Sequence, residues 1–219
     1  MLKKIKDSKF YRPYTTKQHK QVWLNWLGRT TEQYWQEYIS TWNHPHRFVI
    51  SNALRSINWT SLMEVGCGSG PNLANILQHH KGKQVGGVDI NPKAIEVAGK
   101  TFRGGMFKVG SAEDILISDK GTDVILSDMT YVYVGPFKIR KYLKEARRVA
   151  REYVILCEFH ETNWFRRQKL RLNSGMHAYD YKKLLESLDF YNVSLYKMPK
   201  FEEDNDYSFR WLIIARVPK

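Results

Sequence analysis

Apolar positions along this chain change their spacing from one segment to the next. Short continuous apolar runs alternate with longer segments in which apolar residues recur every three or four positions. The runs are typical of buried strands, and the periodic segments are typical of helices that cover a sheet. The strands predicted in this way are residues 61–65, 84–89, 106–109, 123–127, 153–158, 190–196 and 210–217.

Helical segments separate these predicted strands. They cover residues 71–79, 92–100, 136–150 and 180–188. Pro71 and Pro92 suit the first turn of a helix, where a backbone N–H is not needed. Strands that alternate with helices predict a parallel sheet covered by helices. Ligands of such sheets bind at the carboxyl ends of the strands, so that edge is where a site is expected.

The residues before the first strand are predicted to be helical. Thr30-Thr31-Glu32-Gln33 has the form of a capping box, and the dipeptide His44-Pro45 should end the helix that follows. That helix carries Tyr34, Trp35, Tyr38, Ile39 and Trp42. A second helix is expected over about residues 46–56. We therefore predict a helical cap over residues 1–58 and a core over residues 59–219, with a basic insertion at about residues 159–178.

Composition restricts the class of protein. A chain of 219 residues with 42% hydrophobic residues fits one α/β domain with a modest addition. We expect a cytoplasmic protein with no membrane partner, because no apolar run is long enough for a membrane span or a signal peptide. Cys67 and Cys157 suggest neither a disulfide framework nor a metal site.

The net charge of +13 is high and unevenly distributed. One basic cluster lies within residues 1–29, and a second comprises Arg166, Arg167, Lys169 and Arg171. Such clusters can attract RNA or a phosphorylated small molecule. The alternative interpretation is that these residues form a solvated basic face with no partner. Net charge affects the electrostatic steering of charged ligands and does not determine the fold.

A glycine-rich segment follows the first predicted strand. Gly66, Gly68 and Gly70 alternate with small residues, and glycine permits positive φ and close approach of a ligand. A strand, a glycine turn and a helix in this order can hold an adenosine-containing cofactor. A dinucleotide fingerprint would have its third glycine at position 71, which is Pro71 here. The spacing therefore counts against NAD, which remains the alternative cofactor.

Acidic side chains end two later strands. Asp89 lies where a carboxylate can accept hydrogen bonds from a ribose diol. It could also serve only to cap the helix at Pro92. Asp128 ends the fourth strand. The alternative to a functional role is that its side chain only caps a turn.

Several of these segments resemble class I S-adenosylmethionine (SAM) methyltransferases. Glu64-Val65-Gly66-Cys67-Gly68-Ser69-Gly70 resembles their motif I, residues 109–114 their adenine loop, and residues 123–131 their motif IV. The resemblance covers roughly residues 61–217. It implies a three-layer, Rossmann-like α/β fold with a mostly parallel seven-stranded sheet, an antiparallel strand near the C-terminus and an N-terminal helical cap.

The resemblance also implies SAM as cofactor and S-adenosylhomocysteine as product. In it, Asp89 binds the ribose and Ile90 packs on the adenine. Ser111 stands where the family often has Asp, so Ser111, Glu113 and Asp114 are all candidates for the adenine amino contact. The implied cofactor-binding residues are Glu64, Gly66, Cys67, Gly68, Gly70, Asp89, Ile90, Ser111, Ala112, Glu113, Asp128 and Met129.

The chemical class of the methyl acceptor is narrowed mainly by exclusion. The segment Asp128-Met129-Thr130-Tyr131 lacks the prolines typical of enzymes that methylate exocyclic or amide nitrogens. It also lacks the Pro-Cys pair of DNA cytosine methyltransferases. We expect Asp128, Tyr131 and His160 to be catalytic. Further candidates on the acceptor side are Tyr133 and Glu158, and Arg47 is a candidate partner for the methionine carboxylate.

These observations favour methyl transfer to an oxygen or nitrogen of a small molecule, which the basic clusters would allow to be anionic. An RNA methyltransferase acting on tRNA or rRNA is one alternative. A non-catalytic SAM-fold binding subunit is another. The oligomeric state does not follow from the sequence.

Overall fold

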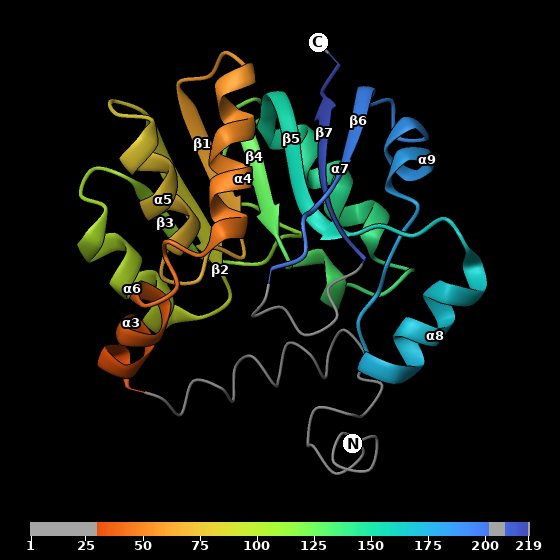
Figure 1. Cartoon of the computed structure of the whole chain (residues 1–219). Helices are drawn as coiled ribbons and strands as arrows, with labels where there is room; N and C mark the ends of the chain where they lie inside the picture. Colours follow the sequence, from red (N-terminus) through yellow and green to blue (C-terminus); the bar gives the residue numbers. More distant parts are fainter. Residues whose placement is uncertain (1–29, 202–208, 219) are drawn as a thin grey trace, which may run out of the picture.

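The computed structural model describes residues 30–201 and 209–218 (Figure 1). Its centre is a seven-stranded sheet in the order β3-β2-β1-β4-β5-β7-β6. The strands are β1 (Ser61–Val65), β2 (Gln84–Asp89), β3 (Met106–Val109), β4 (Thr122–Asp128), β5 (Ala150–Phe159), β6 (Tyr191–Lys197) and β7 (Arg210–Arg216). The first five strands pair in parallel, and β7 pairs antiparallel with both β5 and β6. The predicted sheet, mostly parallel with an antiparallel strand near the C-terminus, is confirmed.

Helices cover both faces of this sheet (Figure 1). They are α3 (Thr31–Ile39), α4 (Pro45–Ala53), α5 (Pro71–His79), α6 (Pro92–Thr101), α7 (Ile139–Val149), α8 (Trp164–Ser174) and α9 (Tyr181–Glu186). Two short 3-10 helices, η2 (Leu54–Ser56) and η3 (Tyr131–Tyr133), complete the described elements.

Successive residues of each central strand face opposite sides of the sheet, which creates two hydrophobic cores. Leu62 of β1 belongs to one core together with Ile50 of α4 and Leu73 of α5. Met63, the next residue, belongs to the other core together with Leu143 of α7 and Leu185 of α9. The continuous apolar runs in the sequence therefore reflect strands that are buried on both faces.

Some element boundaries differ from those predicted. The helix expected over residues 136–150 begins only at Ile139, because Lys138 and Ile139 first close a turn onto the Gly135 carbonyl. Strand β5 begins at Ala150, three residues earlier than predicted, and follows α7 directly. Within the insertion, residues 164–174 form α8, which the sequence did not identify as a helix.

The cap region forms two short helices. The Thr30 hydroxyl accepts the Gln33 backbone N–H at 3.2 Å, and the Gln33 side chain accepts the Thr30 N–H at 3.1 Å, so the predicted capping box is formed. His44 caps α4, and Pro45 occupies its first turn. The basic cluster predicted within residues 1–29 lies outside the described residues. Within the described part of the chain, no helix has the length and apolar character needed to cross a membrane.

Candidate functional site

The turn after β1 requires its glycines. Gly66, Gly68 and Gly70 have φ of 73°, 54° and 90°, a region that residues with a Cβ rarely adopt. A Cβ on Gly66 would lie 2.1 Å from the Thr130 hydroxyl oxygen, and one on Gly70 would lie 2.4 Å from the Phe102 ring. The turn therefore packs closely against the segment after β4 and against the end of α6.

Asp89 joins this turn to the end of β2. One carboxylate oxygen accepts the Gly68 N–H at 2.9 Å, and the other accepts the Asn91 N–H at 2.8 Å. Burial raises the pKa of Asp89, and these two backbone hydrogen bonds oppose the rise. Each carboxylate oxygen has a further lone pair, so the side chain can still accept hydrogen bonds from a diol.

The Cys67 side chain has a packing role in the turn. A Cβ on Gly87 of β2 would lie 2.4 Å from the Cys67 sulfur, so the thiol fills the space that Gly87 leaves open. Burial raises the pKa of the Cys67 thiol, which keeps the sulfur neutral.

The loop after β3 lies next to Asp89. Gly110 donates its N–H to the Asp89 carbonyl at 2.9 Å, and Ser111 hydrogen-bonds with Tyr142. Ala112 is buried, whereas Glu113 lies 3.4 Å from the Lys138 ammonium. The Glu113 carboxylate therefore lies beside a lysine, and Ser111, Glu113 and Asp114 all stay candidates for an adenine contact.

A buried polar cluster connects β1, β4, α4 and α5. Asp128, at the end of β4, lies 3.0 Å from His46 Nε2 and accepts Asn72 Nδ2 at 3.1 Å. The same Asn72 nitrogen donates to Glu64 Oε1 at 2.6 Å, and the Arg47 guanidinium donates to Asn72 Oδ1. Two helices thus bring their polar side chains onto two acids at the carboxyl edge of the sheet.

The two acids in this cluster have opposite electrostatic environments. Burial raises the pKa of Asp128, but nearby His46, Arg47 and Arg210 outweigh burial and hold it well below its usual range. Burial raises the pKa of Glu64 to about 8 despite the hydrogen bond from Asn72. Glu64 Oε2 is buried without a hydrogen-bond partner among the described residues.

The hydrogen bonds of His46 fix the orientation of its ring. An ionised Asp128 can only accept, so His46 Nε2 donates to it. His44 Nδ1 accepts the His46 backbone N–H at 3.3 Å and lies 2.6 Å from His46 Nδ1. The His46 ring is therefore held between Asp128 and His44.

Glu158 organises the segment after β4. Its Oε1 accepts the Ser127 hydroxyl at 2.8 Å and the N–H groups of Thr130 and Tyr131, and its Oε2 accepts the Val132 N–H at 3.1 Å. Burial raises the pKa of Glu158 to about 7 against these donors. The carboxylate thus faces the backbone of η3. The sequence had predicted instead that Glu158 would lie on the acceptor side. Met129, in the same segment, has φ of 52°, a strained value for a residue with a Cβ.

Tyr131 and His160 do not join this cluster through any contact seen in the described residues. The Tyr131 ring is fully buried in the hydrophobic core edge-on to Tyr142, and burial holds the pKa of its phenol well above the usual range. His160 Nδ1 accepts the Tyr181 N–H at 3.1 Å, its ring packs against Trp211, and burial lowers its pKa. Asp128 is the one of the three predicted catalytic residues that lies in the buried polar cluster.

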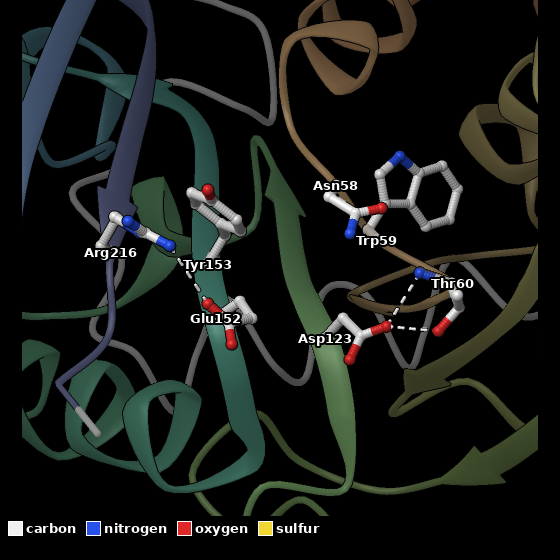
Figure 2. Close-up of a pocket in the computed structure, with 7 residues that line it drawn as sticks. All are labelled: Asn58, Trp59, Thr60, Asp123, Glu152, Tyr153 and Arg216. Carbon is white, nitrogen blue, oxygen red and sulfur yellow. Dashed lines mark hydrogen bonds and ion pairs between the residues drawn. The ribbon is translucent and has the colours of Figure 1, made fainter.

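A separate cavity of about 370 Å³ lies at the other end of the sheet (Figure 2). It is lined by Asn58, Trp59, Thr60, Asp123, Glu152, Tyr153 and Arg216. Its charged groups are already paired: Asp123 accepts from Thr60, and Glu152 lies 3.3 Å from Arg216. Since Thr60 and Asp123 lie at the amino ends of β1 and β4, this cavity is not the one expected beside the glycine turn.

Comparison with known proteins identifies a methyltransferase domain within part of the chain. Residues 62–153 match the family model described as a methyltransferase domain. No curated protein sequence matches the chain. The matched segment contains the glycine turn, Asp89, the loop after β3 and Asp128. Together with the fold, this match supports a class I SAM-dependent methyltransferase with SAM as its cofactor.

Solved structures show the same fold. A chain of the complex between the Haloferax volcanii Trm112 methyltransferase activator and a methyltransferase has a TM-score of 0.61 at 16% identity, covering 84% of this chain and 98% of that one. A SAM-dependent methyltransferase from Archaeoglobus fulgidus has a TM-score of 0.59 at 18% identity, covering 78% and 94%.

One further structure was solved with small molecules. It is a Haemonchus contortus phosphoethanolamine N-methyltransferase in complex with phosphomonomethylethanolamine and S-adenosylhomocysteine. Its TM-score is 0.62 at 11% identity, and the match covers 80% of this chain and 53% of that one.

The residues at the carboxyl edge fit SAM chemically. The unpartnered Glu64 Oε2 is an acceptor suited to the ammonium of the methionine part. Asp89 has acceptor capacity left for a ribose diol. Sequence reasoning missed His46, Asn72 and the capping role of His44. For Asn72 the available signal was its position in the first turn of the helix after the glycines.

Proposed function

We propose that this protein is an enzyme that transfers the methyl group of SAM to an oxygen or nitrogen of a small, anionic acceptor. The observation that carries the proposal is the contact of cap helix α4 with motif IV, through His46 and Asp128 at 3.0 Å. A cap helix bound at this point covers the carboxyl edge of β4, which favours a small enclosed acceptor over a polymer.

The cofactor would be held by residues on three strand ends. We assign the ribose to Asp89, the adenine to Ile90, Ser111 and Ala112, and the methionine ammonium to Glu64. Gly66, Gly68 and Gly70 would allow close approach of the ligand along the turn. Bound SAM supplies a methyl group already activated by a sulfonium centre.

The chain's own contribution would be orientation and exclusion of water. Asp128 fixes the orientation of His46 and is near Arg47, at 3.8 Å from its guanidinium. His46, Arg47 and Arg210 all act to lower the pKa of Asp128. Two guanidinium groups near one carboxylate favour an anionic acceptor. From this position the Arg47 guanidinium would bind either the acceptor or the methionine carboxylate.

A methyl-transfer assay tests the proposal. The full chain is incubated with methyl-labelled SAM and a fractionated cell extract, and label is counted separately in metabolites, RNA and protein. We expect label in the metabolite fraction, and none there with an Asp89→Ala control. Label in RNA would establish the RNA alternative instead. SAM binding by calorimetry without any labelled product would indicate a non-catalytic subunit, and binding of NAD in place of SAM would refute the cofactor assignment.

A further inference from the structure

Helix α8 projects from the carboxyl end of the sheet, outside both helix layers (Figure 1). Its ends are well defined: the Asn163 side chain accepts the Arg166 N–H at 3.1 Å, and Gly175 ends the helix with φ of 74°. Both are strong local signals for helix termini. No residue of α8 is fully buried, so local capping and one anchoring side hold it in place.

The anchoring side of α8 faces the protein. Leu170 packs on the small core that contains Val132 and Phe159. Arg166 forms an ion pair with Glu161 at 3.0 Å, and its guanidinium lies 5.3 Å from the centre of the Phe209 ring. Arg166 therefore contributes to the attachment of the helix.

The opposite side of α8 carries large apolar residues. Phe165 and Leu172 are seven residues apart and so lie within about 20° of each other around the helix. Leu170 lies about 140° away from Phe165, on the anchoring side. Trp164, Phe165 and Leu172 are 57%, 76% and 66% exposed, and we call these three residues the apolar stripe. Adjacent large apolar side chains with this much exposure mark interaction surfaces.

Basic residues border the apolar stripe. Lys169 and Arg171 are exposed and lie on either side of it around the helix. The chain as a whole carries a net charge of +13. A helix with an outward apolar face bordered by cations is suited to the headgroup region of an anionic bilayer, where the apolar residues insert and the cations meet lipid phosphates.

We propose that the apolar stripe of α8 docks onto the surface of a membrane that contains anionic phospholipid. The expectation of no membrane partner rested on the absence of a spanning segment, and a helix bound at the surface needs none. Eleven residues span about 16 Å, too short to cross a bilayer, so the helix lies in the interface. The stripe is less suited to nucleic acid, because Leu172 has no ring for stacking. The Trp164 and Phe165 rings also meet edge to face at 82° and do not form parallel platforms.

Docking in this way has a geometric consequence. Helix α8 follows β5, whose carboxyl end lies beside that of β4. Membrane binding would therefore turn the edge of the sheet that carries Asp128 toward the bilayer. The proposal is one of lipid binding, and it holds whether or not the chain transfers methyl groups.

Vesicle flotation with the full chain tests this proposal. The vesicles contain phosphatidylcholine alone or with about 30% phosphatidylglycerol, a composition that gives an anionic surface. We expect at least about tenfold tighter binding to the anionic vesicles. Phe165→Ser combined with Leu172→Ser should weaken that binding about tenfold or more. Leu116→Ser combined with Tyr196→Ser, which changes two other exposed apolar residues, should leave it within about twofold.

A charge-reversal pair provides the second test. Lys169→Glu combined with Arg171→Glu should also weaken vesicle binding about tenfold or more. Lys182→Glu combined with Lys183→Glu on α9 makes the same change in net charge and should weaken vesicle binding much less. Circular dichroism checks that every variant is folded. Equal binding to neutral vesicles, or no loss in the α8 variants, would overturn the proposal. So would loss of poly-U binding in those variants with unchanged vesicle binding.

Discussion

The imidazole of His46 lies 3.0 Å from the carboxylate of Asp128, although 82 residues separate them in the chain. This contact joins the cap helix α4 to the end of β4, in the middle of the sheet. Both side chains are almost fully buried, and the Arg47 guanidinium lies 3.8 Å from the same oxygen. Helix α4, whose Ile50 packs in the hydrophobic core, is therefore also joined to β4 by buried contacts of the Asp128 carboxylate with His46 and Arg47.

Asp128→Asn should loosen this attachment. The carboxamide cannot neutralise the Arg47 guanidinium, and breaking a buried pair by removing one partner typically costs about 3 kcal/mol. We expect a loss of this size in the free energy of unfolding, measured by urea denaturation, and faster amide exchange over residues 45–53. Glu152→Gln breaks the more exposed pair with Arg216 and should cost less than about 1 kcal/mol. Unchanged exchange in α4 would show that the cap does not depend on Asp128.

Glu64 should couple SAM binding to proton release. Its pKa of about 8 means that the unliganded carboxyl is mostly protonated near pH 6.5. An ammonium placed against it favours the ionised form and expels the proton. The affinity for SAM should therefore rise with pH between pH 6 and 7, by up to about tenfold per unit, before the ligand's own amino group deprotonates at about 7.7–8.0.

Calorimetry measures this effect directly. Titrations in two buffers of different ionisation enthalpy should report release of up to about one proton per SAM bound near pH 6.5. Glu64→Gln has the same shape and no titration, so its binding should show neither proton release nor the rise with pH. A wild-type affinity that is flat from pH 6 to 7 would contradict the assignment of Glu64 to the ammonium.

The sequence predicted most of the fold because the information is local. The strands at residues 61–65, 84–89 and 106–109 begin and end where they were predicted, since each is a short segment bounded by turn residues. The glycine turn was found for the same reason, because its three positive φ values are required within five residues. Local signals also gave the capping box at Thr30.

The polar cluster could not be predicted in this way, because it depends on contacts between distant elements. His46 lies in a short helix far from β4 in sequence, and no spacing rule relates it to Asp128. The position of Glu158 at a strand end suggested an acceptor-side role, but its direction depends on the N–H groups of η3. Tyr131 follows motif IV directly, yet its ring turns into the hydrophobic core. Side-chain direction after a strand end is set by tertiary packing.

Asp89→Ala should weaken SAM binding more than tenfold. The substitution removes both acceptors of a ribose diol and also releases the Gly68 N–H, which the carboxylate holds at 2.9 Å. Calorimetry at pH 7.5 gives the affinity. Asn91→Ala is the matched control, because the Asn91 side chain only caps α6 by accepting the N–H groups of Lys93 and Ala94. It should lower stability by about 1 kcal/mol and leave the SAM affinity nearly unchanged. Equal affinities of wild type and Asp89→Ala would show that the ribose lies elsewhere.

Asp123 should stabilise the fold in a way that acid removes. Burial acts to raise its pKa, but hydrogen bonds from Thr60 and Ser61 and the charge of Arg151 outweigh burial and lower it to about 2. A folded pKa below the unfolded value of about 3.9 contributes stability that is present above pH 4 and is lost as pH falls toward 2. Asp123→Asn should therefore cost about 2 kcal/mol at pH 6, and this deficit should shrink steadily between pH 4 and pH 2.

Urea denaturation across that pH range measures the deficit. Asp119→Asn serves as the control, because Asp119 is an exposed partner of Arg148 and its removal should cost less than about 1 kcal/mol at any pH. The Asp123 carboxylate ties the start of β4 to Thr60 and Ser61 at the start of β1, so its loss should act on the sheet and not on the cofactor edge. A deficit in Asp123→Asn that is the same at pH 6 and pH 2.5 would mean that packing, and not ionisation, accounts for the role of this residue.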